Sequence, residues 1–561
     1  MSSWSVTRKG EKVQRIPRSA DLLRACRHLR RARIYKGHLV LHFLLLTFTL
    51  SLQVPTTLMT STSTNLRADL HDVIENSRLK CGIPGMSIAV LHKGSLVFAE
   101  GFGKRNEQDP FTVETLAPIG SLTKAFTATS IGELVAEGKM DWDITPVNKY
   151  LPEFELKDPV LTSQLTLVDL LSHRTGLPDV DMCFYKSSVP RRSLIKRLRH
   201  VEMNSKLGSK FLYNNAMYAV AGEAAANVMG ISYEDVVREK VIQPLNLANT
   251  GFSQTEMKKR SNHASGFSAS SLQDAQKGDF KSVGLDETYM ACAPAADMYS
   301  NVQDMVKWGR TVVKLGELDG KQVLDRKSVE TTLTAHTIVP GPRRMPELAL
   351  VWTYGLGWGL DSFKGHAFYH HTGATGGFSS SLILFPDEDL VIAQLFNIRH
   401  SEISPCIAYY VADKILGLPT TKDWLFDVAI RSTEEVYEAL EKRRIGNLPE
   451  RVSNKPPSHS LDVYVGEYSH PVFGRFSVRL ENDTKEEKPE GLVFDLWTFE
   501  GRLEHYHFDH FVLRLVSMST NQPYLAMFQT GAAGKVASIL LDSHGGQIEF
   551  KRIDVPGTDR S

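Results

Sequence analysis

The stretch IGSLTKAFTATSIGELVAEGKM, Ile119 to Met140, places a serine and a lysine three residues apart at the start of a helical pattern. Apolar residues follow at helical spacing, and Gly138 ends the run. We therefore expect Ser121 at or near a helix N-terminus. The exposed amides and the positive dipole end favour an oxyanion there, so the position suits a serine that becomes negative during a reaction.

Lys124 follows Ser121 by one helical turn and is expected on the same side of the helix. A partly desolvated lysine loses its proton near neutral pH and can accept the proton of a serine, which turns a weak alcohol into a nucleophile. The same spacing also arises by chance, and a serine at a helix start is an ordinary N-cap. The pair alone leaves both interpretations open.

Two later stretches carry side chains that complement this pair. GSKFLYNNAMYAVAGEAAANVMG places Tyr213 and Asn215 just before an alanine-rich helix. A tyrosine near an ammonium can be held as a phenolate and move a proton, while an asparagine can orient a substrate carbonyl. YHHTGATGGFSSSL places His371 and Gly373 on the way into a strand, and the next residue, Ala374, offers a backbone N–H for an oxyanion hole.

In this order and at these separations, the three elements resemble the serine β-lactamase and penicillin-binding protein superfamily. The most similar branch is the class C-like one, with D-aminopeptidases, carboxylesterases and LACTB-type proteins. The resemblance covers roughly residues 66–418. It extends to three further stretches, namely LLSHRTGLPD (170–179), APAADMYSNVQDMVKWG (293–309) and YGLGWGL (354–360).

The resemblance implies an activity and a role for each matching residue. It implies a serine hydrolase in which Ser121 is acylated, Lys124 is its base or electrostatic partner, and Tyr213 is general base and then general acid. No metal or other cofactor is implied. The substrate would be a small ester or a peptide, including D-peptides. The alternative is a catalytically silent binding or scaffolding protein that retains the fold and assembles through its C-terminal domain.

The substrate-binding side is also implied by the resemblance. Asn215 would contact the substrate amide, and the N–H groups of Ser121 and Ala374 would bind the oxyanion beside Gly373. His371 stands where penicillin-recognising members have a lysine. Because a neutral or half-charged imidazole anchors a carboxylate less firmly than a fixed cation, esters or peptides are expected before antibiotics.

The apolar patterns predict one mixed sheet made from distant parts of the chain. MSIAVLHKGSLVFAEGFG, Met86 to Gly103, forms two apolar runs around a Lys93-Gly94 turn, and SSSLILF and LVIAQLFN flank residues 386–389 in the same way. The long segment between these hairpins has mostly helical periodicity, and residues 404–416 form one more helix. We expect an α/β (α+β) fold, an antiparallel sheet flanked by helices with a helical insertion, and a cleft between them.

A polar, proline-containing linker follows a charged helix at Ser432–Arg444 and sets a domain boundary near residue 455. Beyond it, six strand-like runs predict an all-β barrel or sandwich, which resembles the lipocalin-like appendages of some superfamily members. Narrowing of the cleft, substrate binding and homo-oligomerisation remain open as its role. The expected divisions are 1–38, 39–56, 66–418, 419–456 and 457–555.

A basic arm and one apolar segment begin the chain. Residues 1–38 contain eleven Lys or Arg against two acids, and LVLHFLLLTFTLSLQV then runs from Leu39 to Val54. We expect a signal anchor or a cleaved signal peptide, with the catalytic domain extracellular or lumenal, either membrane-anchored or secreted. The sequon at Asn482 suits a lumenal location. An arginine-rich mitochondrial presequence is the open alternative.

The bulk composition describes a globular protein with several cores. At 561 residues, about two or three domains are expected. A net charge of +1 and 42% apolar residues give no overall attraction to nucleic acid, which is therefore not an expected partner. The five cysteines are far apart and form no C-x-x-C pair, so we expect buried free thiols rather than disulfides or a zinc site.

Overall fold

The computed structural model describes residues 57–184, 187, 189–284, 290–341, 345–446, 448–481, 491–496, 499–515, 523–543 and 546–553. The basic arm, the apolar segment at 39–54 and the sequon at Asn482 lie outside these ranges, so the expectations drawn from them stay predictions. Within the described ranges, no helix is both long enough and apolar enough to cross a membrane.

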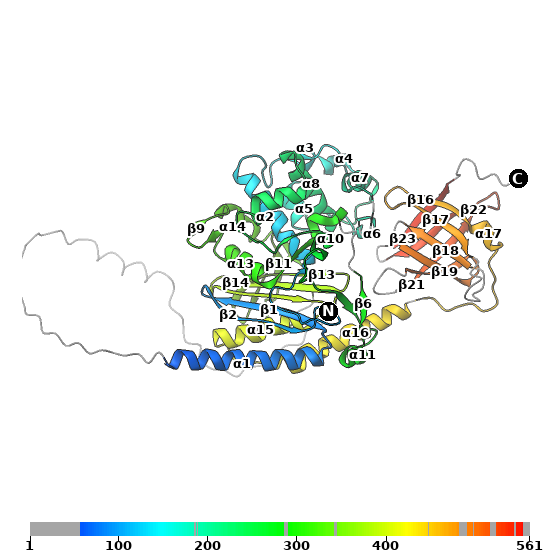
Figure 1. The fold of residues 1–561 in the computed structure, drawn as a ribbon. Helices are drawn as coiled ribbons and strands as arrows, with labels where there is room; N and C mark the ends of the chain where they lie inside the picture. The colour runs from blue at the N-terminus through cyan, green and yellow to red at the C-terminus, as the bar shows by residue number, and fades with distance from the viewer. Residues whose placement is uncertain are drawn as a thin grey trace, which may run out of the picture. The chain divides into compact units, whose positions relative to one another are not determined.

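An eight-stranded antiparallel sheet is the centre of the first domain (Figure 1). Its order is β10-β11-β12-β13-β14-β15-β1-β2, so the N-terminal hairpin pairs directly with the second predicted hairpin and closes the sheet from both parts of the chain. The predicted fold class is therefore confirmed. The strands are β1 Gly85–His92, β2 Ser95–Gly103, β10 Thr337–Val339, β11 Trp352–Tyr354, β12 Gly359–Phe363, β13 His366–Thr375, β14 Phe378–Phe385 and β15 Leu390–Phe396.

The turn chemistry explains the first hairpin. Lys93 and Gly94 have φ angles of 49° and 80°, which is the backbone that a two-residue hairpin turn with right-handed strand twist requires. The amide of Lys93 also donates to the carbonyl of Asp389, at 2.8 Å, in the turn of the second hairpin. The two predicted turns are thus tied together at one end of the sheet.

Both faces of the sheet are buried, which the strand β14 illustrates. Leu382 and Leu384 pack into a cluster with α13 (Val302–Val313) and α2 (Thr123–Ala136). Ile383 and Phe385 alternate with them and pack against α1 (Thr57–Lys80) and α15 (Ile403–Leu416) on the other face. Successive side chains of a strand point to opposite faces, so a continuous apolar run is what a sheet covered on both sides needs.

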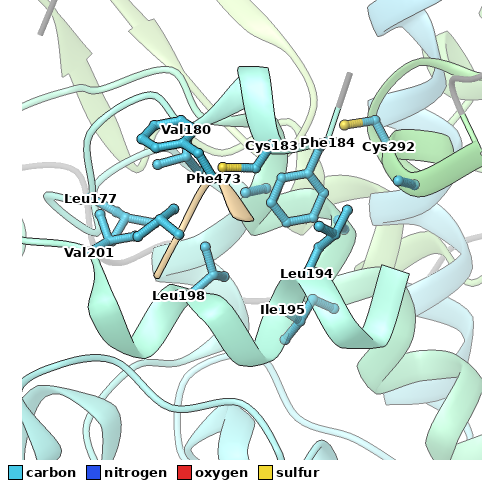
Figure 2. Packing of buried hydrophobic residues seen from close by; sticks show 14 of the residues in the cluster. Leu177, Val180, Cys183, Phe184, Leu194, Ile195, Leu198, Val201, Cys292 and Phe473 are labelled. Carbon is cyan, nitrogen blue, oxygen red and sulfur yellow. The ribbon is translucent and has the colours of Figure 1, made fainter. Parts of the chain in front are cut away.

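A helical insertion separates the two halves of the sheet. Some of its apolar side chains form a buried cluster that includes Leu177, Phe184 and Leu198 (Figure 2), and others, such as Val237 and Val329, pack into the cluster that contains Leu382. Its helices are α3 Val147–Tyr150, α4 Pro159–Thr162, α5 Leu167–Leu171, α6 Asp181–Phe184, α7 Arg191–Arg197, η3 Leu198–His200, α8 Asn215–Met229, α9 Tyr233–Val237, η4 Arg238–Ile242, α10 Gln254–Lys258, α11 Leu272–Lys277, η5 Met290–Cys292, α12 Ala293–Ala296 and α14 Arg326–Thr332.

Short strand pairs and free thiols complete the first domain. The cysteines in the described part of the chain are free and buried, as predicted: Cys81, Cys183, Cys292 and Cys406. The short strands are β3 Ala117–Pro118, β4 Gly251–Phe252 and β7 Met298–Ser300 in one sheet, β5 Gly266–Ser268 with β6 Lys281–Val283, and β8 Glu317–Leu318 with β9 Lys321–Gln322. The predicted helix at 432–444 lies within α16 (Ala429–Ile445), after η6 (Trp424–Val428).

The C-terminal domain is a closed antiparallel barrel, entered through α17 (Leu461–Tyr464). Buried side chains such as Tyr468, Phe476, Phe494 and Phe528 fill its interior. The sequence predicted six strands; the described barrel has eight, because β19 is rich in charged and histidine residues that hide the apolar alternation and β23 was not recognised as a strand. The strands are β16 Gly466–His470, β17 Gly474–Glu481, β18 Gly491–Leu496, β19 Phe499–His507, β20 His510–Leu515, β21 Pro523–Thr530, β22 Val536–Ser543 and β23 Gly546–Ile553.

Truncation of Trp308 should test the packing that joins α13 to α2. Trp308 is fully buried and stacks on Phe126 with a ring-centroid distance of 4.4 Å. Trp308→Ala leaves a cavity under the sheet, and we expect a loss of about 3–5 kcal/mol in the free energy of unfolding, measured in urea. Val160, which is 61% exposed, supplies the control. Val160→Ala should change the free energy of unfolding by about 0.5 kcal/mol or less. Equal effects of the two substitutions would contradict this packing.

Candidate active site around Ser121

Ser121 lies in a single 3₁₀ turn, η2 (Gly120–Leu122), directly before α2. Backbone and side-chain bonds fix this turn: the amide of Ile119 donates to the carbonyl of Met298 at 2.9 Å, and Thr123 Oγ1 donates to the carbonyl of Gly120 at 2.6 Å. The predicted position of Ser121 at a helix start is confirmed. The residue as a whole is half-buried.

Strand β13 presses its backbone against this turn. A Cβ on Gly373 would lie 1.9 Å from the carbonyl oxygen of Ile119, and one on Gly120 would lie 2.7 Å from the amide nitrogen of Ala374. Ser380 Oγ on β14 donates to the same Ile119 carbonyl at 2.7 Å. Because no side chain separates the two segments, the backbone of Ala374 reaches the turn that carries Ser121, as an oxyanion hole made by both amides would require.

The amine of Lys124 is fully buried among three oxygen atoms. Its Nζ lies 3.2 Å from Ser121 Oγ, 2.6 Å from Asn215 Oδ1 and 3.0 Å from the carbonyl oxygen of Ala295 in α12. Burial lowers the pKa of Lys124 to about 7, although the negative charge of Asp181 opposes the shift. The amine is therefore partly neutral near physiological pH.

Asp181 is a site residue that the sequence did not reveal. Its Oδ2 accepts a 2.6 Å hydrogen bond from Asn215 Nδ2, which turns the amide oxygen of Asn215 toward Lys124. Burial raises the pKa of the Asp181 carboxyl. The residue is the first of the short helix α6, 34 positions before Asn215, and no motif spacing marks it.

Tyr213 is placed beside the nucleophile but not as a phenolate. Its hydroxyl hydrogen bonds with the side chain of Ser121, and its ring lies 4.7 Å from Lys124 Nζ, while 39% of the residue remains exposed. Desolvation raises the pKa of Tyr213, so the phenol keeps its proton near neutral pH. This direction favours the phenol over the phenolate that a nearby ammonium can stabilise.

His173 holds the loop that carries Tyr213. The amide of Asn214 donates to His173 Nδ1 at 3.0 Å, and the His173 ring lies 4.3 Å from the Tyr213 ring. Asn214 also caps α8, because its side chain accepts from the amide of Met217. These contacts place Tyr213 and Asn215 on either side of a fixed residue.

His371 is buried and neutral. Its Nδ1 donates to the carbonyl of Thr372 at 2.6 Å, so its Nε2 is left to accept a 2.9 Å hydrogen bond from the hydroxyl of Tyr354. Burial lowers the pKa of His371 to about 3. The imidazole therefore offers no positive charge to a substrate carboxylate near neutral pH. Among the described residues, no three His, Cys, Asp or Glu side chains come together to hold a metal ion.

Substitution of Gly373 should test the close approach of β13 to the Ser121 turn. Gly373→Ala places a methyl group on the carbonyl of Ile119, so we expect the strand to shift and the free energy of unfolding to fall by about 1–3 kcal/mol. Gly341→Ala is the matched control, because a Cβ there meets nothing within 4 Å. Gly373→Ala protein as stable as the control in urea would show that the two segments are not in contact.

Comparison with known sequences identifies two regions. A sequence profile described as Beta-lactamase matches residues 66–415, and one described as a domain of unknown function, DUF3471, matches residues 450–555. The chain is 26% identical over 432 residues to unguisins hydrolase ungD' of Aspergillus campestris, covering 74% of this chain and 78% of that protein. It is 25% identical over 357 residues to protein flp of Staphylococcus aureus, covering 62% of this chain and 66% of that one.

Solved structures support the same fold. The octameric penicillin-binding protein homologue from Pyrococcus abyssi superposes with a TM-score of 0.55 at 21% identity, covering 86% of this chain and 99% of that one. A class C β-lactamase superposes with a TM-score of 0.52 at 19% identity, covering 64% of this chain and 98% of that one.

Proposed function

We propose that this chain, which belongs to the β-lactamase family, is a serine hydrolase. In the proposed reaction, an ester or peptide acylates Ser121. The surroundings of Lys124 carry this proposal. The oxygen of Asn215 and the carbonyl of Ala295 can only accept hydrogen bonds, so a neutral amine donates its two N–H groups to them. Its lone pair then faces Ser121 Oγ, whose hydroxyl has a proton to give.

Acylation follows from this arrangement. Ser121 Oγ attacks the carbonyl carbon of the substrate while its proton passes to Lys124 Nζ. The amides of Ser121 and Ala374 stabilise the oxyanion of the tetrahedral intermediate. Removal of one such donor in other serine hydrolases slows the reaction by about 10²–10³.

Expulsion of the leaving group needs a proton, which the neutral phenol of Tyr213 supplies. The phenolate so formed recovers a proton from the Lys124 ammonium, and the site returns to its starting protonation state with an acyl group on Ser121. Water then attacks the acyl-enzyme, its proton passes to the same amine, and Ser121 leaves as an alcohol. Each proton that leaves one group arrives at another, so the cycle needs no cofactor.

The substrate class rests on His371 and on the edge of β13. The neutral imidazole of His371 gives a β-lactam carboxylate no fixed cation, which favours esters and peptides. β12 pairs with β13 only up to His370, and among the described strands no other one covers the edge beyond it. A free strand edge suits an extended peptide, including a peptide with D-residues, which hydrogen bonds along it.

Labelling with a fluorophosphonate should identify Ser121 as the nucleophile. We expect the wild-type protein to be labelled and Ser121→Ala to be unlabelled, because the probe reacts only with an activated serine. Ser130→Ala is the matched control, since Ser130 lies on α2, the helix that follows Ser121, and its hydroxyl donates to the carbonyl of Thr127. Folded wild-type protein that neither labels nor hydrolyses any ester would favour the silent scaffold instead.

The pH dependence of the acylation rate should follow the protonation state of the Lys124 amine. Below its pKa of about 7 the amine is an ammonium without a lone pair, so the rate should rise with pH through about 7 and then level off. Asp181→Asn removes a carboxyl whose negative charge stabilises the ammonium, and the midpoint should move to lower pH. Asp319→Asn, in the exposed turn after β8, should leave the midpoint in place. If Asp181→Asn leaves the midpoint of the pH dependence unchanged, Lys124 is not the general base of acylation.

A further inference from the structure

A cavity of about 430 Å³ lies beside the turn between β13 and β14. Its walls come from β5 and β6, from the end of β15 and from α16. Gly377 in that turn lines it, and Gly377 packs so closely on Gly266 of β5 that a Cβ on either glycine would lie 3.0 Å or less from the other's Cα. The cavity is therefore built onto the end of the strand that supplies Ala374.

The charges around this cavity are mostly positive. Lys281 and Arg399 line it, both are exposed, and neither has an ion-pair partner among the described residues. Arg444 also lines it and pairs at 2.8 Å with Glu441, the only acid among the described residues of the lining. His400, a further lining residue, has its pKa lowered to about 4 by burial and by repulsion from Arg399 and Arg443. Within the described part of the chain, two cations at this cavity therefore have no acid beside them.

The direction of the free edge of β13 relates this cavity to the reaction. Tyr213, the proposed donor to the leaving group, lies near His371 at the start of the edge, with ring centroids 6.4 Å apart. The leaving group is therefore expected at that end. The acyl part of the substrate then runs the other way, past Thr375 toward Gly377 and the cavity.

We propose that this cavity is an acyl-side subsite that selects substrates whose acyl chain ends in, or carries, a carboxylate. Lys281 and Arg399 bind the carboxylate, and the rings of Phe267 and Tyr437 contact the apolar chain that leads to it. The inference rests on the proposed hydrolysis at Ser121. The subsite adds a preference for a carboxylate on the acyl chain, which the neutral imidazole of His371 does not provide.

Paired ester substrates should measure this preference. Nitrophenyl monoesters of straight-chain dicarboxylic acids of increasing length are compared with esters of monocarboxylic acids of the same chain length. We expect the ratio of their kcat/KM values to favour the acidic ester at one chain length, to fall about fivefold in Arg399→Gln and in Lys281→Gln, and to decline as salt is added. Arg431 lies near the start of α16, pairs with Asp427 and does not line the cavity, so Arg431→Gln should leave the ratio unchanged. A ratio insensitive to Arg399→Gln and Lys281→Gln overturns the subsite.

A binding measurement separates failure of the subsite from failure of the hydrolase. Calorimetry of the full-length Ser121→Ala protein with monoamides of the same dicarboxylic acids needs no turnover. Binding that weakens in the double variant with Arg399→Gln supports the subsite even if no ester is hydrolysed. Binding that the second substitution leaves unchanged, or no binding to either protein, overturns the subsite even if neutral esters are hydrolysed well.

Discussion

The burial of one amine, that of Lys124, is the constraint on which the site depends. A fully buried ammonium is costly unless it is paired, and here the neighbours lower the cost by accepting hydrogen bonds rather than by supplying a close carboxylate. The acid of the site, Asp181, contacts Asn215 and not the lysine. This spacing keeps the amine easy to deprotonate and leaves its lone pair for Ser121.

The packing of small residues brings the necessary elements together. Lys124 belongs to α2, but the oxygens around it come from α8 and α12, which are distant in sequence. Gly222 on α8 lets Pro294 approach so closely that a Cβ would lie 2.5 Å from its ring. The close approach at Gly222 brings α12, and with it the carbonyl of Ala295, near α8. On the other side, Gly120 and Gly373 do the same for β13.

The sequence predicted the elements of this site better than their chemical states. Alternating apolar runs and the Lys93-Gly94 turn were sufficient to predict the hairpins. The sequence motifs were sufficient to predict that Ser121, Lys124 and Tyr213 belong to one site. Asp181 could not be found, because nothing in its local pattern states that it will meet Asn215. The direction of the Tyr213 pKa could not be predicted for a related reason, since the pKa depends on burial by residues from other parts of the chain.

Other features depended on tertiary structure in the same way. The sequence of the charged strand β19 shows no clear alternation of apolar and polar residues. Its position between β18 and β20 follows from closure of the barrel. Lys281 and Arg399 read as ordinary surface charges until β6 and the end of β15 come together around one cavity. Local pattern therefore predicts which elements form, while charge state and shared cavities require knowledge of which elements meet.

Direct titration of Lys124 tests whether its buried amine is neutral near pH 7. In protein with ¹³C at the ε carbons of lysine, nuclear magnetic resonance follows each amine with pH, and Lys124→Met assigns the resonance by its loss. We expect this lysine to titrate near 7, far below the ordinary value of 10.5. A Lys124 resonance that titrates at the ordinary value would mean that the amine is an ammonium at neutral pH and cannot accept the proton of Ser121.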